Sequence, residues 1–182
     1  MDEQRLWAPW RLSYIAGDKS VDPAASIEPI AWKAGSEPTC FMCRAAAEYA
    51  SEGAARKQHL VVAVDAAAVA LLNLYPYNNG HLLVCPRRHV AQLHELTPEE
   101  HLAAMKMLGD FTQRYARLIR AEGFNIGLNL GRAAGAGVPG HLHWHLVPRW
   151  TGDSNFMPTT AGTRVIQQSI EELWEAIVSE RD

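Results

Sequence analysis

Three histidines at alternate positions, His141, His143 and His145, constrain this chain more than any other feature of its sequence. Large apolar residues separate them, which is typical of a strand, from residue 140 to 150, with one buried face. Side chains two residues apart on a strand share one face of the sheet. The pattern therefore predicts three neighbouring imidazoles, which can serve as ligands, nucleophiles or proton donors.

The rest of the chain predicts further strands around one long helix. Thr97, Pro98 and Glu100 are typical of a helix start, and the apolar spacing continues this helix to Leu118. The Ala- and Glu-rich stretch 43–55 favours a short helix, and residues 165–179 favour an amphipathic terminal helix. Predicted strands cover residues 60–64, 69–74, 81–85, 124–130 and 140–150. This order favours an α+β fold with an antiparallel five-stranded sheet over a doubly wound parallel sheet.

Length and composition predict one domain with an N-terminal arm. The chain has 182 residues, of which 48% are hydrophobic, enough for one substantial core. Residues 6–15 are rich in aromatic side chains, and a Pro-, Ser- and Ala-rich passage continues to residue 38. We therefore expect an arm over residues 1–38 and a single domain over residues 39–182.

The charge pattern limits the partners. The formal charge is −3, and no basic run is present, so the sequence argues against binding to a nucleic acid polymer but leaves a small anionic ligand possible. No apolar run is typical of a signal peptide or a membrane span. We therefore expect a cytoplasmic protein without a membrane partner.

Three cysteines are too few and too unevenly spaced for a secreted disulfide framework. Cys40 and Cys43 form a C-x-x-C pair, which suits a redox dithiol, a packing pair, or half of a tetrahedral zinc site. The motif alone does not choose among these. Cys85 lies in an apolar run, which is typical of a packing residue.

A glycine-rich segment, residues 131–137, precedes the histidines. It suits a plain flexible connection, but small residues such as Gly135 and Gly137 also let main-chain N–H groups approach a phosphate. It lacks the Gly-Lys-Ser/Thr of a Walker loop and leads into a strand, unlike a dinucleotide fingerprint. Its position beside three imidazoles favours the phosphate-binding hypothesis.

Several segments carry a family resemblance. The His-x-His-x-His spacing, followed by apolar residues, resembles the histidine triad (HIT) family, which acts on nucleotide α-phosphates. Four further segments are similar to the bacterial diadenosine tetraphosphate phosphorylases of that family: residues 6–11, 73–82, 123–131 and 148–157. The resemblance covers most of the chain and implies the HIT fold, a nucleotide substrate, and a homodimer joined through the long helix and a strand.

The resemblance also implies roles for the histidines. The central one, His143, would attack phosphorus and form a covalent nucleotidyl intermediate, since imidazole is neutral at pH 7 and also leaves easily. His145 would hold phosphate or assist the leaving oxygen, and His141 lies beside them. Asn73 would lie near the ribose, and Asn129 would face the phosphates.

A structural zinc ion is a further implication of the family. Its zinc-bearing members take one histidine from a Pro-x-x-His segment, matched here by His89, and another from the first triad position, His141. With Cys40 and Cys43 these complete four ligands, and His94 is the alternative to His89. Four protein ligands leave no open position, so the metal would orient the triad rather than activate water.

The chain departs from the family pattern at one point, and two hypotheses for its function remain. Many small triad hydrolases carry Gln-Ser where this chain has Gly137 and Val138, so main-chain groups would contact the phosphate or the substrate differs. His145 argues against the uridylyltransferase branch, which has glutamine there. The first hypothesis is a nucleotidyl hydrolase or phosphorylase, with water or phosphate as acceptor. The second is a non-catalytic, zinc-stabilised nucleotide-binding protein, which would not need so exposed a nucleophile.

Overall fold

The computed structural model describes residues 27–154 and 166–180. The predicted aromatic arm, the last residues of the segment 148–157, and the predicted start of the final helix at residue 165 lie outside the described residues. Among the described residues, no helix has the length and apolar character that a membrane crossing requires.

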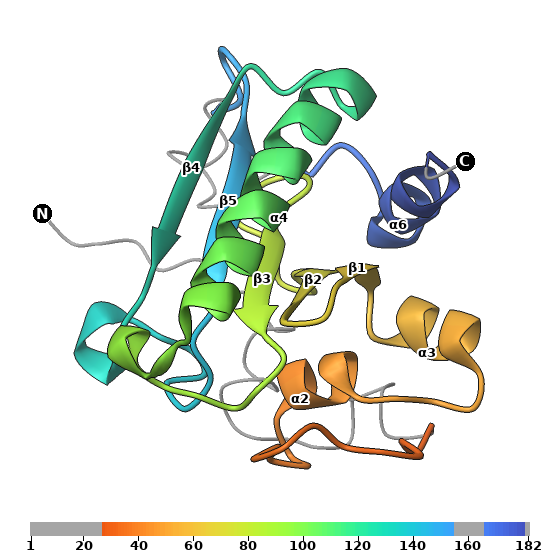
Figure 1. Cartoon of the computed structure of the whole chain (residues 1–182). Coiled ribbons are helices and arrows are strands. Elements are labelled where there is room, and N and C mark those ends of the chain that lie inside the picture. Colours follow the sequence, from red (N-terminus) through yellow and green to blue (C-terminus); the bar gives the residue numbers. More distant parts are fainter. Residues whose placement is uncertain (1–26, 155–165, 181–182) are drawn as a thin grey trace, which may run out of the picture.

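Five antiparallel strands form one sheet in the order β1-β2-β3-β5-β4. The strands are β1 (Val61–Val64), β2 (Ala68–Leu72), β3 (Leu82–Pro86), β4 (Gly123–Leu128) and β5 (Trp144–Arg149). The predicted α+β fold with a five-stranded antiparallel sheet is confirmed. Because β5 lies between β3 and β4, the end of the histidine segment occupies the interior of the sheet (Figure 1).

The helices are α2 (Phe41–Ala46), α3 (Glu52–Gln58), α4 (Pro98–Leu118) and α6 (Ile170–Ser179), with short 3₁₀ turns η3 (Leu93–Glu95) and η4 (Arg132–Ala134). The start of α4 is as predicted. The Thr97 hydroxyl accepts from the Glu100 N–H at 3.3 Å, and the Glu100 carboxylate accepts from the Thr97 N–H at 2.9 Å. This reciprocal pair satisfies two N–H groups that the helix start leaves without partners.

The single short helix predicted over residues 43–55 is wrong. The structure has two helices there, α2 and α3, separated by residues 47–51. Glu48 lies in this break and pairs with the main chain near Ala31, through Ile30 N–H to Glu48 O at 2.8 Å and Glu48 N–H to Ala31 O at 2.9 Å. Tertiary pairing therefore overrides the local helix propensity.

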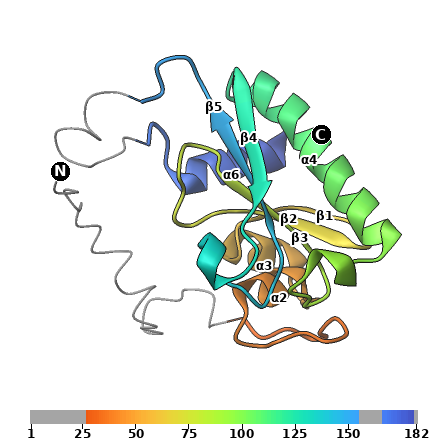
Figure 2. The same cartoon turned by 90° about the vertical axis from the view of Figure 1, so that its left-hand side faces the viewer.

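The two faces of the sheet carry different helices. The long helix α4 crosses one face, as the two views in Figures 1 and 2 show, and packs against β2 and β3. Helix α2 packs on the other face of β2. Alternate residues of β2 therefore enter separate apolar clusters: Ala70 and Leu72 lie toward α4, and Val69 and Leu71 lie toward α2.

The strand predicted over residues 140–150 is partly wrong. Ladder pairing of β5 begins at Trp144, so His141 and His143 precede the strand. The main chain bonds elsewhere in this region: Leu142 N–H donates to Val90 O at 2.7 Å. The three histidines are consequently not three equivalent positions of one strand.

Candidate active site and metal centre

Four side chains from distant parts of the chain converge beside the start of β5. Cys40 caps the N-terminal end of α2, Cys43 lies within it, His89 follows β3, and His141 precedes β5. One ligand atom from each lies within 4.8 Å of all the others. The sequence prediction proposed these four residues, and the structure brings them together. The alternative ligand, His94, is exposed on η3 and lies outside this group.

Three distances between side chains of this cluster are close to those around a tetrahedral cation. The Nδ1 atom of His141 lies 3.4 Å from Cys40 Sγ and 3.5 Å from Cys43 Sγ, and the Nδ1 atom of His89 lies 3.2 Å from Cys43 Sγ. Zinc bonds of about 2.0 Å to nitrogen and about 2.3 Å to sulfur place neighbouring ligand atoms about 3.3 to 3.8 Å apart. Two thiols and two imidazoles also match the donor set that zinc prefers.

The protonation of the cluster suits a metal ligand set. The side-chain hydrogen bond between the two thiols lowers the pKa of Cys43 to about 3, which favours its thiolate, and raises the pKa of Cys40, which keeps its proton until a cation displaces it. Burial acts to lower the pKa of His141, but hydrogen bonds with Cys43 and Cys85 outweigh it and raise this pKa to about 10. Nε2 of His141 lies 2.9 Å from the carbonyl oxygen of Pro86, which accepts its hydrogen. Nδ1 then faces the thiols, and a cation would displace the proton there.

One hydrogen bond fixes which ring nitrogen of His143 carries the hydrogen. Its Nδ1 lies 2.7 Å from the carbonyl oxygen of His141. A carbonyl oxygen only accepts, so Nδ1 carries the hydrogen and Nε2 keeps its lone pair. Burial lowers the pKa of His143, which keeps the ring neutral at pH 7. A neutral imidazole with a free Nε2 lone pair is a nucleophile.

A fourth histidine, His81, completes the site. Its Nδ1 accepts from the main-chain N–H of Tyr77 at 3.0 Å and faces the Asn73 amide nitrogen at 3.2 Å. Nδ1 is therefore unprotonated, and the hydrogen lies on Nε2, which is 3.0 Å from Nδ1 of His145. His145 accepts at Nδ1, so it carries its own hydrogen on Nε2. This chain of bonds makes His145 a donor toward the site.

Burial keeps this pair of rings neutral. It lowers the pKa of His81 to about 3 and that of His145 to about 4, with smaller contributions from neighbouring imidazoles. The ring of His145 lies 5.0 Å from that of His143, centroid to centroid. The structure thus places a lone pair on His143 next to an N–H donor on His145.

The loop before β3 shapes this arrangement. Tyr77 stacks on His81 with ring centroids 4.6 Å apart. Gly80 has φ +74°, and a Cβ atom there would lie 3.0 Å from the Ile119 side chain and 3.2 Å from that of Pro148. Glycine is the residue that accepts both the positive φ and the close contact. Sequence reasoning assigned no role to His81, although the resembling segment 73–82 contains it, and its position directly after the Gly80 turn was the available signal.

The predicted nucleotide-binding residues fall into two groups. Asn73 lies against His81, and the Asn129 amide nitrogen lies 3.5 Å from His145 Nε2, so both border the imidazoles. With the hydrogen of His145 on Nε2, two donors face each other there, so this contact is not a hydrogen bond. Gly135 and Gly137 lie exposed in the loop around η4, where Gly135 has φ +84°. No contact in the described residues joins these two glycines to the histidines, so their role stays a prediction.

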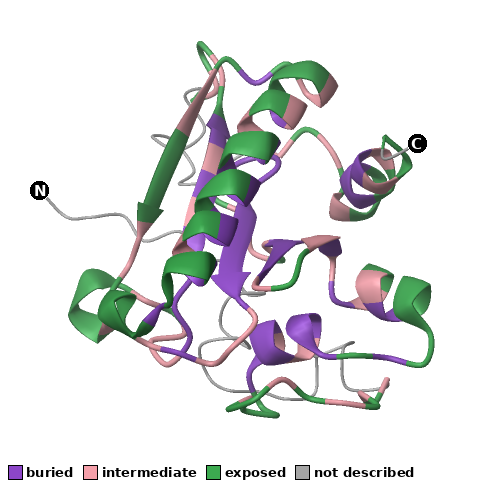
Figure 3. Ribbon diagram, in the orientation of Figure 1, coloured by how far each residue is buried: buried purple, intermediate pink, exposed green. Residues whose placement is uncertain are grey.

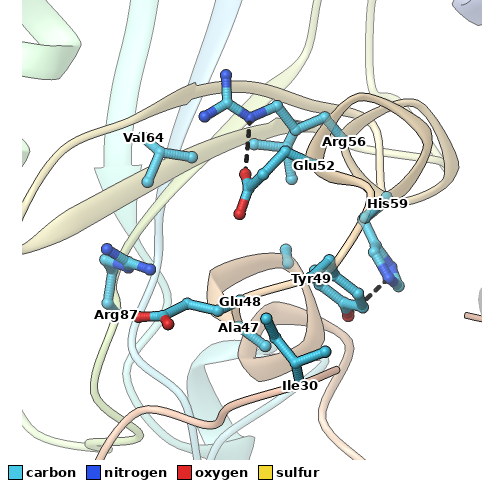
Figure 4. A pocket seen from close by; sticks show the side chains of 12 residues that line it. Ile30, Ala47, Glu48, Tyr49, Glu52, Arg56, His59, Val64 and Arg87 are labelled. Atoms are coloured by element: carbon cyan, nitrogen blue, oxygen red, sulfur yellow. Dashed lines mark hydrogen bonds and ion pairs between the residues drawn. The ribbon is translucent and has the colours of Figure 1, made fainter. Parts of the chain in front are cut away.

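A separate hollow of about 450 Å³ lies among α2, α3 and β1. Among the described residues, no triad histidine lines it. Figure 4 shows its polar side chains turned toward one another: Tyr49 bonds to His59 at 2.9 Å, and Glu52 pairs with Arg56 at 3.5 Å. The Arg87 guanidinium donates hydrogen bonds to the carbonyl oxygens of Ala46 and Asp65. Because the polar groups of this hollow are paired with one another, we look for the reactive groups at the histidine site instead.

Comparison with known proteins agrees with this geometry. Residues 55–152 match the family model described as the HIT domain. An AP-4-A phosphorylase of Mycobacterium tuberculosis is 40% identical over 182 residues, spanning 97% of this chain and 84% of the relative. A hypothetical histidine triad nucleotide-binding protein of Sulfolobus tokodaii is 30% identical, with a TM-score of 0.54 over 66% of this chain and 81% of that one. The Plasmodium falciparum diadenosine triphosphate hydrolase shares the fold, with a TM-score of 0.55 and 21% identity over 66% of this chain and 75% of that one.

The fold, the arrangement of the histidines and this similarity show that the chain belongs to the histidine triad family. The predicted membership is therefore confirmed. The prediction of an enzyme of the family's nucleotide hydrolases and transferases is confirmed as well, since the similarity to the mycobacterial AP-4-A phosphorylase spans nearly the whole chain and the histidine triad is intact.

Proposed function

We propose that this protein cleaves adenylylated substrates such as diadenosine tetraphosphate at an α-phosphate, through a covalent nucleotide on His143. One observation carries the proposal: the Nδ1 hydrogen of His143 is held by the His141 carbonyl at 2.7 Å, which leaves Nε2 as the free nucleophile. The similarity to the mycobacterial AP-4-A phosphorylase supports this substrate class.

The proposed reaction has two displacements. Nε2 of His143 attacks the α-phosphorus, so that an N–P bond forms while the P–O bond to the leaving polyphosphate breaks. Phosphate or water then attacks the same phosphorus, and the N–P bond breaks. Imidazole serves both steps because it attacks while neutral and leaves readily from phosphorus.

His145 is proposed to donate during the first displacement. Its Nε2 hydrogen faces the site because its Nδ1 is occupied by His81 at 3.0 Å. A fixed N–H donor stabilises the charge that develops on a phosphate or leaving oxygen. His141 contributes through its carbonyl group, and we propose no proton transfer by its ring, which lies among the thiols.

The surface beside His145 leaves room for a substrate. Gly127 is its register partner on β4, and a Cβ atom there would meet nothing within 4 Å. Asn73 and Asn129 border this space, and we propose that they contact the ribose and the phosphates. The main-chain N–H groups around Gly135 and Gly137 are proposed to bind phosphate in place of the Gln-Ser pair of other family members.

We also propose that Cys40, Cys43, His89 and His141 hold a structural zinc ion. The ligand spacing and the lowered pKa of Cys43 support this assignment. When bound, such an ion supplies cross-linking of distant segments and charge neutralisation of the thiolates. With four protein ligands in place, the ion would have no open position for water.

A homodimer is the proposed assembly. Strand β4 lies at one edge of the sheet and pairs, among the described residues, only with β5. Figure 3 shows part of β4 and the outer side of α4 as exposed, and the rest of β4 is half-buried. Large apolar side chains lie on these surfaces, namely Ile126 at 48%, Leu102 at 63% and Met105 at 48% exposure. An open edge beside apolar side chains suits pairing with a second copy. A light-scattering mass near one chain, 20.2 kDa, at micromolar concentration would contradict it.

Two coarser expectations belong to the same proposal. We place the boundary between arm and domain near residue 38, and the protein in the cytoplasm. Limited proteolysis and fractionation of the native host test these two points.

Product analysis tests the reaction. Diadenosine tetraphosphate is incubated with the protein, with and without inorganic phosphate. ADP plus ATP identifies phosphate as the acceptor, and AMP plus ATP identifies water. If neither pair of products forms, the result would favour the non-catalytic nucleotide-binding hypothesis. Two inversions should leave retained configuration at a chiral α-phosphorothioate, whereas net inversion would mean direct attack without a covalent nucleotide.

A further inference from the structure

The Asp153 carboxylate accepts hydrogen bonds from two separate segments of the chain. A turn closed by Asp153 N–H to Trp150 O at 3.0 Å brings this side chain, which is 6% exposed, back beside the end of β5. It accepts from Arg149 Nε at 2.6 Å and Nη2 at 2.8 Å, from the Trp150 N–H at 3.2 Å, and from the amide nitrogen of Asn78 at 2.9 Å. The hydrogen bonds from Arg149 lower the pKa of Asp153 to about 2, so the carboxylate stays ionised at pH 7.

Asn78, at the other end of this contact, is also buried. Its amide nitrogen donates a second hydrogen bond to Pro148 O at 3.1 Å, and its side-chain oxygen accepts from the Asn79 N–H at 3.0 Å. Two acceptors thus face the nitrogen and one donor faces the oxygen, which fixes the orientation of the amide. One NH2 group therefore joins the turn before β3 both to β5 and to Asp153.

This turn determines how His81 is held. The carbonyl oxygen of Asn78 accepts from the His81 N–H at 3.1 Å, and the N–H of Tyr77, the residue before Asn78, donates to His81 Nδ1 at 3.0 Å. The Asn73 amide and the stacked Tyr77 ring add further contacts to the imidazole. All of these contacts lie within residues 73–81, whereas the amide of Asn78 joins the turn to β5.

The link to β5 matters because β5 also carries His145. Nε2 of His81 lies 3.0 Å from Nδ1 of His145, which is three residues before Pro148. A hydrogen bond between a turn and a strand keeps its length only while the two hold one relative position. If the amide of Asn78 loses its acceptors, the turn moves relative to β5 and the bond between His81 and His145 weakens.

We propose that Asp153, acting through Asn78, is a positioning residue for the reaction: it holds the turn on β5, so that His81 donates to Nδ1 of His145 and the hydrogen of His145 stays on Nε2. The inference rests on the proposed function, in which His145 is the donor. Asp153 acts through two other side chains rather than on the reacting atoms. Its loss should therefore slow turnover and spare KM.

Asn78→Asp tests this link with a side chain of nearly the same size. The new carboxylate faces Asp153 and Pro148 O, so both bonds of the amide nitrogen are lost, whereas the ion pair with Arg149 remains. We expect kcat for diadenosine tetraphosphate to fall about tenfold, with KM within about twofold of the wild type. In long-range ¹H–¹⁵N spectra of the full-length, ¹⁵N-labelled protein at pH 7, the share of the Nε2–H tautomer at His145 should fall. An unchanged kcat and His145 spectrum would overturn the proposal.

Arg149→Gln is the matched control. It removes the ion pair with Asp153 and a bond of 2.8 Å to Asn125, but it leaves the contact between Asp153 and Asn78 in place. This variant should have a lower Tm, while kcat and the His145 spectrum stay as in the wild type. Losses of kcat that follow the losses of Tm in both variants would show a general structural role and would overturn the proposal.

Two variants of Asp153 give a second test that does not depend on the folding of Asn78→Asp. In Asp153→Asn, the remaining oxygen can still accept from Asn78 and from Arg149 Nε, whereas Asp153→Ala loses every acceptor. We expect kcat within about twofold of the wild type for Asp153→Asn and about tenfold lower for Asp153→Ala. Equal kcat values for these two variants would overturn the proposal.

Trapping of labelled nucleotide on His143 separates this inference from the proposed function. No trapped nucleotide in the wild-type protein, together with a His145 spectrum that responds to Asn78→Asp, would overturn the function and support the positioning role. Trapped nucleotide in the wild-type protein, together with an unchanged kcat and His145 spectrum in Asn78→Asp, would overturn the positioning role and support the function.

Discussion

The two parts of the site differ in how they are held together. In the Cys/His cluster, four donor atoms from residues up to 101 positions apart face one another within 4.8 Å. In the imidazole group, every Nδ1 atom already has a partner, such as the His141 carbonyl for His143 and the Tyr77 N–H for His81.

Because of this difference, we expect the cluster to determine the stability of the fold and the imidazole group to determine the rate of the reaction. Converging thiols and imidazoles are stable together when a cation neutralises the thiolate charge, so the cluster contributes to folding through the ion. The imidazole group is preorganised by hydrogen bonds alone, which leave a lone pair on Nε2 of His143 and a hydrogen on Nε2 of His145. Substitutions in the cluster should mainly lower the Tm, and substitutions of the imidazoles should mainly lower kcat.

The largest effect on rate is expected for His143→Ala. The change removes the attacking nitrogen and should lower kcat by at least about a thousandfold, while folding and nucleotide affinity stay close to those of the wild type. Steady-state assays with diadenosine tetraphosphate, together with equilibrium binding of AMP, measure both quantities. Turnover near the wild-type rate would refute the assignment of the nucleophile.

The largest effect on stability is expected for Cys43→Ala. Loss of a ligand should remove the bound zinc, about one ion per chain by elemental analysis, and lower the Tm by about 10 °C or more. His94→Ala should change neither. Freshly purified, untagged wild-type protein without metal would contradict this prediction.

A smaller loss of rate is expected for His81 and His145. Each change to alanine should slow turnover by about a hundredfold, the usual contribution of a positioned proton donor. The double variant should be little slower than either single variant, because His81 acts through His145. Losses that multiply in the double variant would show that the two residues act independently.

The smallest effect is expected for Gly80→Ala. The positive φ and the 3.0 Å approach to Ile119 should destabilise the fold by about 1 to 3 kcal/mol, measured by urea unfolding. Gly53→Ala is the matched control, since Gly53 lies within α3 with open space around it and should gain up to about 1 kcal/mol. Equal stability of the two variants would show that the turn before His81 tolerates a side chain.

The sequence predicts features that depend on local chemistry. The start of α4 follows from Thr97, Pro98 and Glu100, whose capping bonds involve only neighbouring residues. The family resemblance adds the grouping of Cys40 with His141 and their partners, which no local pattern could supply. The resemblance works there because its motif carries information about a distant segment.

Features that depend on tertiary contacts escaped prediction. Strand β5 begins later than the alternating pattern predicts. The His141 carbonyl accepts a hydrogen bond from the His143 side chain and the His141 ring lies in the Cys/His cluster, so His141 does not pair with a neighbouring strand. The role of His81 depends on its bond to His145, 64 residues away. The alternation of polar and apolar residues along one segment carries no information about either of these contacts.

The central claim is that His143 carries the nucleotide during turnover, and chemical trapping tests it most directly. The protein is mixed with diadenosine tetraphosphate labelled at both α-phosphates, and the reaction is stopped in alkali during turnover. A phosphoramidate survives alkali and is cleaved in acid. We predict labelled AMP on the wild-type chain after alkaline treatment, none after acid treatment, and none on His143→Ala. An actively turning-over wild-type protein without label after the alkaline stop would contradict the covalent mechanism.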